Sequence, residues 1–318
     1  MSKMKVWCFE QYGPPSVLKL RERAIPQPGA GEVLVKVAAT AVNPSDVKNV
    51  SGHFKSATPR VPGRDYAGTI VAGDGREGEE VWGSGPGFGV ARDGVHAEYF
   101  VMPTAWISRK PSHLGTEQAA AIGVPYLAAW SALVTVGQIQ PGETALVTGV
   151  SGAVGRAATQ IGHWKKARVI GASLSLDNPS GADAIIDTSR QDLVEEVRAV
   201  TEGKGVDLVL DVIGGAMFEP CLKAVRYGGR QVAIASNPQV VSFNLVDFYH
   251  EDKRLLSVDT MSLSGPDIVQ LMDQLRAGFE EGVLQPPATQ SWAFEQAVEA
   301  YEAVAEGWPP VKHVLTLP

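Results

Sequence analysis

The chain has 318 residues, of which 44% are hydrophobic and 20% charged, and its formal net charge is -7. This length and balance predict about two globular domains. The longest basic run, Lys165-Lys166, is too short for a surface that binds nucleic acid or anionic lipid, since both need clustered Lys and Arg. Two cysteines are too few for a disulfide framework.

No apolar stretch approaches the roughly 20 residues that a membrane helix requires. The N-terminal segment before Gly13 also has no apolar core of the kind found in secretory signals. We therefore expect a cytoplasmic protein with neither nucleic acid nor membrane as a partner.

Residues before about position 110 are predicted to be mostly β-structure. Short apolar or β-branched runs are separated by Pro and Gly clusters, and alternation of Val33, Val35 and Val37 with other side chains is typical of a partly buried strand. The expected strands are Lys5–Phe9, Leu18–Glu22, Glu32–Val42 and Glu80–Trp82.

After Gly115 the pattern changes to alternating helices and strands. Such alternation predicts right-handed crossovers and a doubly wound parallel sheet with helices on both faces, an α/β fold. The expected helices are Thr116–Ala121, Leu127–Val136, Ala153–Trp164, Asp192–Val200 and Met217–Tyr227. The expected strands are Thr144–Thr148, Arg168–Gly171, Ala184–Ile186, Asp207–Asp211 and Gln231–Ala235.

Two more helices, Pro266–Glu281 and Phe294–Glu306, are expected near the C-terminus. The closing strand, Lys312–Leu317, has no helix after it. It is therefore free to return to the N-terminal β domain.

A glycine-rich turn follows the strand Thr144–Thr148 and leads at once into a helix. Strand, glycine turn and helix together form the context that a dinucleotide-binding fingerprint requires. Backbone N–H groups and the positive end of the helix would hold a pyrophosphate there. The residues of the predicted site are Gly149, Ser151, Gly152, Ala153, Val154 and Gly155.

The glycine spacing is G-x-x-G-x-x-G rather than G-x-G-x-x-G, so a tight turn without a ligand is an alternative. A hydrolase elbow at Ser151 would need glycine where Ala153 stands. The end of the second strand offers Ala172 and Ser173 in place of the carboxylate with which NAD enzymes bind the ribose. This favours NADPH, although no Arg or Lys follows closely to bind its phosphate, and NADH stays open.

With these residues placed, the chain resembles the medium-chain dehydrogenase/reductase superfamily, and specifically its zinc-free quinone oxidoreductase branch. The segments that carry the resemblance are Ile25–Gly29, Glu32–Val37, Asn43–Asp46, Val61–Gly68, Ala119–Trp130, Gly149–Gly155 and Val311–Leu315. The resemblance implies a GroES-like β domain, expected at residues 1–118 and 280–318. It also implies a Rossmann domain, expected at 119–279, and an active cleft between the two.

The resemblance also implies that catalytic zinc is absent. Zinc-dependent relatives carry Cys near Val42 or Asn43 and His-Glu near Arg64-Asp65. Arg64 is cationic and cannot be a ligand, because zinc is bound by Cys, His or carboxylate groups. The histidines of the chain form no H-x-x-x-H pair.

Candidates for the chemistry come from the same resemblance. Asn43 matches an Asn that lies near nicotinamide and substrate in such reductases, although Asn-Pro is also a common turn opener. Lys48 stands where many members have a cleft Tyr, and either donates to an oxyanion or points to solvent. Tyr126 either lines the cleft or belongs to a core. Asp46 is expected beside the cofactor.

Further cofactor contacts are expected where strands of the parallel sheet end. These positions are Ser173, Ile213, Gly214, Ala235 and Ser236. The resemblance therefore implies an NADPH-dependent reductase of quinones or similar conjugated carbonyls, acting as a homodimer. An enone reductase of carbon–carbon double bonds and a non-catalytic NADPH-binding protein are the alternatives.

Overall fold

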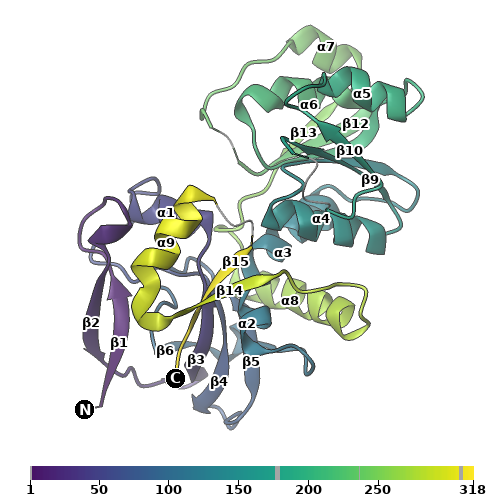
Figure 1. The fold of residues 1–318 in the computed structure, drawn as a ribbon. Coiled ribbons are helices and arrows are strands. Elements are labelled where there is room, and N and C mark those ends of the chain that lie inside the picture. Colours follow the sequence, from purple (N-terminus) through teal and green to yellow (C-terminus); the bar gives the residue numbers. More distant parts are fainter. Residues whose placement is uncertain (1, 176–179, 236, 308–310) are drawn as a thin grey trace. The chain divides into compact units, whose positions relative to one another are not determined.

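The computed structural model describes residues 2–175, 180–235, 237–307 and 311–318. The chain forms two compact units (Figure 1). The first comprises the residues up to Val124 together with Met261–Pro318, and the second comprises Pro125–Thr260. The sequence-based boundaries were 118/119 and 279/280, so they placed most of helix α8 (Gly265–Glu280) in the second unit.

Contacts of α8 explain its place in the first unit. The Phe279 ring packs edge-on against Trp82, with ring centroids 5.8 Å apart. The Ser108 hydroxyl donates to the Asp273 carboxylate over 2.6 Å. An amphipathic pattern predicts a helix but does not say which sheet will cover its apolar face.

The main sheet of the first unit has the strand order β14–β15–β3–β4–β5–β7. Strand β6 also pairs with β3, outside this order. Strands β1 and β2 form a separate antiparallel pair. The bounds are β1 Lys3–Cys8, β2 Lys19–Ala24, β3 Glu32–Ala41, β4 Asp65–Ala72, β5 Glu80–Ser84, β6 Tyr99–Pro103, β7 Ser108–Arg109, β14 Thr289–Ala293 and β15 Lys312–Thr316. The antiparallel pairing of β15 with β3 confirms the predicted return of the closing strand.

The alternation seen in the sequence of β3 produces the core of this unit. Val33, Val35 and Val37 are fully buried and pack with Tyr66 and Met102. A second apolar cluster lies under the helices α1 (Pro44–Val50) and α9 (Ala297–Glu306). The short helix α2 (Thr116–Ala120) packs against β3 and β4 in the same unit. Strands β4 and β6 both pair antiparallel with β3.

The second unit is built on a parallel sheet with the order β10–β9–β8–β11–β12–β13. Counted along the chain this is the order 3-2-1-4-5-6, which defines the Rossmann fold and confirms the predicted fold class. The strand bounds are β8 Thr144–Thr148, β9 Arg168–Ser173, β10 Ala184–Asp187, β11 Val206–Asp211, β12 Val225–Ala233 and β13 Arg254–Ser257.

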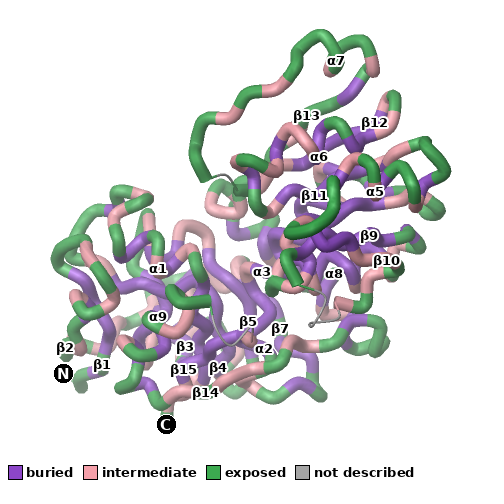
Figure 2. The backbone as a smooth tube through the Cα atoms, turned by 45° about the horizontal axis from the view of Figure 1, so that its top comes forward, coloured by how far each residue is buried: buried purple, intermediate pink, exposed green. Residues whose placement is uncertain are grey.

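Helices cover both faces of this sheet. Helices α5 (Leu193–Val200) and α6 (Phe218–Ala224) pack side by side on one face, and α4 (Ala153–Trp164) covers the other (Figure 1). The sheet strands are largely buried, whereas α7 (Leu245–His250) lies in an exposed segment (Figure 2). Within the described ranges, no helix is both long and apolar enough to cross a bilayer.

Two predicted helices differ in the structure. The stretch Leu127–Val136 divides into α3 (Gly123–Trp130) and a π-helical turn, Ser131–Val136. The stretch Met217–Tyr227 ends as a helix at Ala224, because Val225 already pairs with Val206 as the first residue of β12. In the second case the strand pairing outweighs the local helix propensity.

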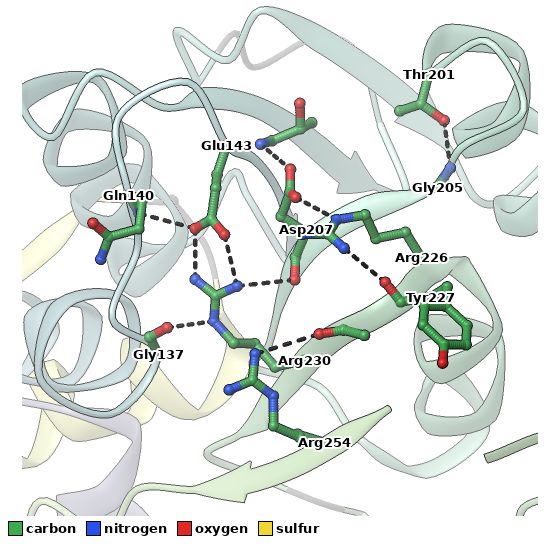
Figure 3. A network of polar contacts seen from close by, with 12 residues as sticks. Gly137, Gln140, Glu143, Thr201, Gly205, Asp207, Arg226, Tyr227, Arg230 and Arg254 are labelled. Atoms are coloured by element: carbon green, nitrogen blue, oxygen red, sulfur yellow. Dashed lines mark hydrogen bonds and ion pairs between the residues drawn. The ribbon is translucent and has the colours of Figure 1, made fainter. Parts of the chain in front are cut away.

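A buried ion-pair network ties together the amino-terminal end of this sheet (Figure 3). Arg230 makes a two-pronged bond to the Glu143 carboxylate, with N–O distances of 3.0 and 2.6 Å. The same guanidinium donates to the carbonyl oxygens of Gly137, Gln138 and Asp207. Because these contacts join the β8, β11 and β12 segments at the edge opposite the glycine turn, we assign them a structural role.

Candidate functional site

The glycine turn lies at the carboxyl end of β8, where the sequence predicted it. Gly149 has φ +57°, a backbone conformation that favours glycine, and Gly152 is the N-cap of α4. Ala153 and Val154 form the first turn of that helix. Their backbone N–H groups therefore belong to the unsatisfied donors at the positive end of α4.

The three glycines are needed for different reasons. A methyl group on Gly155 would lie 2.4 Å from Val150 Cα and 2.5 Å from the Gly149 carbonyl oxygen, so α4 approaches the turn too closely for any side chain. A methyl group on Gly149 would lie 2.8 Å from Val212 Cγ2. On Gly152 it would meet only the Gly149 carbonyl oxygen, at 3.3 Å, and would otherwise project into open space.

The loop after β11 lies beside this turn and is shaped by a buried carboxylate. Asp211 accepts hydrogen bonds from the Thr148 hydroxyl at 3.1 Å and from the backbone N–H groups of Ile213 and Gly214 at 3.1 and 2.9 Å. Ile213 is 43% exposed, which offers an apolar surface next to Gly149. Strands β8 and β11 are the neighbours at which the strand order reverses, and ligands of such sheets bind at that point.

The end of β9 completes the polar surface of the turn. The hydroxyls of Ser173 and Ser151 are 2.9 Å apart and hydrogen-bonded. The Arg156 Nε donates to the Ser151 carbonyl oxygen over 2.9 Å. Arg156 lies one helical turn beyond Gly152, so its side chain reaches the glycine turn from α4.

The structure brings together most predicted cofactor positions of the second unit: Gly149, Ser151, Gly152, Ala153, Val154, Gly155, Ser173, Ile213 and Gly214. Ala235 is exposed beyond the end of β12. Ser236 lies outside the described residues.

In the first unit Asn43 occupies a buried polar cluster. Its amide nitrogen donates to Asp65 Oδ2 over 2.9 Å, and its amide oxygen accepts from Lys312 Nζ. Lys312 Nζ also lies 4.0 Å from Asp65 Oδ2. The other Asp65 oxygen accepts from the Val124 backbone N–H over 2.9 Å. Asp46 accepts from the Asn43 backbone N–H over 2.8 Å and so caps α1.

Burial dominates the electrostatics of this cluster. It raises the pKa of Asp65 and lowers the pKa of Lys312, while the attraction between the two groups opposes both shifts. Burial likewise raises the pKa of Asp46, although the hydrogen bond from the Asn43 backbone opposes this. The amide of Asn43 is thus held in one orientation by an acid on one side and a base on the other.

The remaining candidates lie in different environments. Lys48 is exposed on α1. Tyr126 is buried in the second unit, where its hydroxyl accepts a hydrogen bond from the Gln160 amide over 3.2 Å. Burial raises the pKa of Tyr126, so its phenol is neutral at neutral pH.

Comparison with known proteins agrees with this architecture. Residues 29–112 match the alcohol dehydrogenase GroES-like domain family, and residues 180–315 match the zinc-binding dehydrogenase family. The chain is 32% identical to a zinc-type alcohol dehydrogenase-like protein of Schizosaccharomyces pombe, over 89% of this chain and 88% of the relative. It is 30% identical to a quinone oxidoreductase of Sus scrofa, over 96% of this chain and 94% of the relative.

The chain belongs to the medium-chain dehydrogenase/reductase superfamily. An alcohol dehydrogenase superfamily protein of Novosphingobium aromaticivorans has the same fold, with a TM-score of 0.90 and 28% identity over 99% of this chain and 100% of that one. The predicted resemblance to this superfamily and to its quinone oxidoreductases is confirmed.

As a medium-chain dehydrogenase/reductase, the protein is an oxidoreductase with a fold that binds NAD(P). One of the two matched families is described as zinc-binding. In the part of the chain that the structure describes, no three His, Cys, Asp or Glu side chains group as metal ligands. Asp65, which stands near the family's zinc position, is instead bonded to Asn43 and paired with Lys312. Independence from zinc stays a prediction.

Proposed function

We propose that this medium-chain dehydrogenase/reductase is an NADPH-dependent reductase of quinones or similar conjugated carbonyls. The observation that carries the proposal is the glycine turn at the reversal point of the parallel sheet, with the N-terminus of α4 behind it. The 30% identity to a quinone oxidoreductase over nearly the whole chain supports the acceptor class.

The residues of the turn fit a dinucleotide. Gly152 leaves room for the pyrophosphate, and the N–H groups of Ala153 and Val154 would donate to it. Exposed Ile213 would cover part of the cofactor with apolar surface. When bound, the reduced nicotinamide supplies the hydride.

A preference for NADPH over NADH follows from the end of β9. NAD enzymes place a carboxylate there that accepts from the ribose hydroxyl, whereas this chain has Ser173. A hydroxyl neither repels a phosphate nor replaces the paired ribose contact that a carboxylate makes. We therefore expect tighter binding of NADPH.

Asn43 is our candidate for polarising the acceptor carbonyl. An amide nitrogen carries two hydrogens, and the bond to Asp65 uses one of them. Lys312 fixes the amide oxygen, so the direction of the second N–H is set in advance. Such preorganised donors stabilise developing negative charge without reorganisation. Exposed Lys48 is the alternative donor, and water is an alternative proton source.

An acceptor screen tests this function. Oxidation of NADPH is followed with quinones, enones and aldehydes, and the proposal expects the highest kcat/KM with a quinone. A clear preference for enones would instead identify a reductase of activated carbon–carbon double bonds.

Two variants separate the candidate donors. Asn43→Ala should lower kcat on the order of 10²-fold, or less with an easily reduced quinone, while the Kd for NADPH changes little. Lys48→Met serves as the control and should keep its kcat. Thermal unfolding of both is compared, since Asn43 also bonds the buried Asp65. A loss confined to Lys48→Met would transfer the role to Lys48.

We also propose that the protein is a homodimer that pairs through β13. This strand is the last in the order of its sheet, and exposed Leu255 and Tyr227 lie on it and on the neighbouring β12. Unpaired edge strands readily pair with another copy, and a charge on the edge blocks this. Sedimentation should give a dimer for the wild type and a monomer for Leu255→Lys; a monomeric wild type would contradict the proposal.

A further inference from the structure

The register of three strands brings a buried ion pair to the side chain of Asn43. Ala41, at the end of β3, is paired with Asp65 of β4 on one side and with Val314 of β15 on the other. Asn43 comes shortly after Ala41. Lys312 comes just before Val314, so the antiparallel pairing, continued beyond Ala41, sets Lys312 opposite Asn43.

The two members of this ion pair hold the Asn43 amide from both ends. Lys312 Nζ donates to the Asn43 amide oxygen and, over 3.4 Å, to the Val42 carbonyl oxygen. It also lies 4.0 Å from Asp65 Oδ2, so three oxygens surround a group that carries three hydrogens. Asp65 accepts from the Asn43 amide nitrogen and from the Val124 N–H, each over 2.9 Å.

The bond to Asp65 determines what a partner of the second Asn43 hydrogen would meet. The two N–H bonds of an amide nitrogen diverge by about 120°, so an oxygen that accepts from the second hydrogen lies about 5 Å from Asp65 Oδ2. A carboxylate at that distance repels a developing oxyanion. The repulsion is strong because Asn43 is only 1% exposed, and charges interact more strongly away from water.

The charges around Asn43 balance only when Lys312 is counted. Asp46, which caps α1, is a second buried acid, and Arg64 is a second buried base. Burial raises the pKa of both acids, and attraction by Arg64 opposes this. Removing Lys312 would therefore leave an excess negative charge within about 5 Å of the oxygen that Asn43 is meant to stabilise.

We propose that Lys312 is a positioning residue of the reaction, which neutralises Asp65 so that the second N–H of Asn43 can stabilise an oxyanion on the acceptor. This inference rests on the proposed function, because it assumes that Asn43 faces the carbonyl group that is reduced. It assigns the Asp65–Lys312 pair an effect on the rate, and none on cofactor binding.

Steady-state reduction of a quinone tests the assignment. Lys312→Met should lower kcat by about 10- to 100-fold and leave the Kd for NADPH within about twofold. Lys312→Arg keeps the charge and should retain most of the kcat. The double variant Lys312→Met/Asp65→Asn removes the stranded carboxylate and keeps an amide oxygen that can accept from Asn43. Its kcat should therefore exceed that of Lys312→Met by at least about fivefold.

Lys110→Met is the matched control, because Lys110 is another buried lysine of the first unit. Its Nζ donates to the Leu114 carbonyl oxygen over 2.5 Å and lies 3.4 Å from Glu80 Oε2. This control should unfold more easily than the wild type but keep its kcat. Rates are divided by the folded fraction measured by circular dichroism, and Lys312→Gln replaces Lys312→Met if the latter does not fold.

The opposite outcomes are distinct. A Lys312→Met variant with the kcat of the wild type would show that the ion pair only stabilises the fold. A double variant no faster than Lys312→Met would refute the role of the charge. Either result with an active wild type would overturn this inference alone, whereas a wild type that oxidises NADPH with no acceptor would refute the proposed function itself.

Discussion

Replacing Gly155 by alanine tests why α4 lies so close to the turn. The added methyl group would be 2.4 Å from Val150 Cα and 2.6 Å from the Val150 carbonyl oxygen, both of which are backbone atoms that cannot rotate away. Overpacking of this kind costs about 3 kcal/mol. The better helix propensity of alanine returns about 1 kcal/mol. We therefore expect the free energy of unfolding to fall by about 2 kcal/mol.

The matched variant Gly152→Ala should behave differently. Gly152 has φ -76° and ψ 173°, which any residue adopts, and its methyl group would meet only the Gly149 carbonyl oxygen. Alanine is a somewhat poorer N-cap than glycine, so the loss of stability should stay below about 1 kcal/mol. Because the methyl group would project toward the pyrophosphate, binding of NADPH should weaken by at least about 1 kcal/mol, or roughly fivefold in Kd.

Denaturant unfolding followed by circular dichroism measures the first quantity, and calorimetric titration with NADPH measures the second. The two variants should separate stability from affinity. A folded Gly152→Ala variant with unchanged Kd would show that the pyrophosphate does not lie against this turn. A Gly155→Ala variant as stable as the wild type would show that the close approach of α4 has been misjudged.

Four further predictions concern buried charged groups, the end of β9 and zinc. Burial lowers the pKa of His96 from 6.5 to about 4, so its neutral form stabilises the fold at higher pH; between pH 6.5 and 4 the wild type should lose about 3 kcal/mol of unfolding free energy relative to His96→Gln, and parallel pH profiles would contradict this. Arg230→Met strands the Glu143 carboxylate and should cost about 3 kcal/mol, while the exposed Arg254→Met control should cost under about 0.5 kcal/mol. Ser173→Asp should weaken NADPH by charge repulsion more than NADH, and calorimetry showing the reverse would refute the ribose assignment. Chelators should leave fold and activity intact. Stoichiometric zinc in the untreated protein, together with loss of activity on chelation, would contradict the prediction of zinc independence.

Local signals in the sequence were enough to locate the dinucleotide turn. Strand β8 (Thr144–Thr148) and helix α4 (Ala153–Trp164) have the predicted bounds, because a β-branched run, closely spaced glycines and a helical pattern follow one another without a gap. The alternation of elements after Gly115 likewise predicted the parallel sheet.

Contacts between segments far apart in the chain could not be predicted from the sequence. Lys312 bonds the Asn43 side chain across 269 positions, and their meeting depends on the register of β15 against β3. The hydrophobic pattern of each strand predicts that strand alone and does not determine the register in which the two strands pair.

The most direct test of the account is a single turnover without oxygen, in which protein loaded with one equivalent of NADPH is mixed with para-benzoquinone. We expect the nicotinamide absorbance to fall by one equivalent, at a rate far above that of NADPH and quinone in buffer. With NADH in place of NADPH, a higher nucleotide concentration should be needed for the same rate. Tight binding of NADPH with no oxidation by quinone, enone or aldehyde would contradict the account and leave a non-catalytic dinucleotide-binding protein.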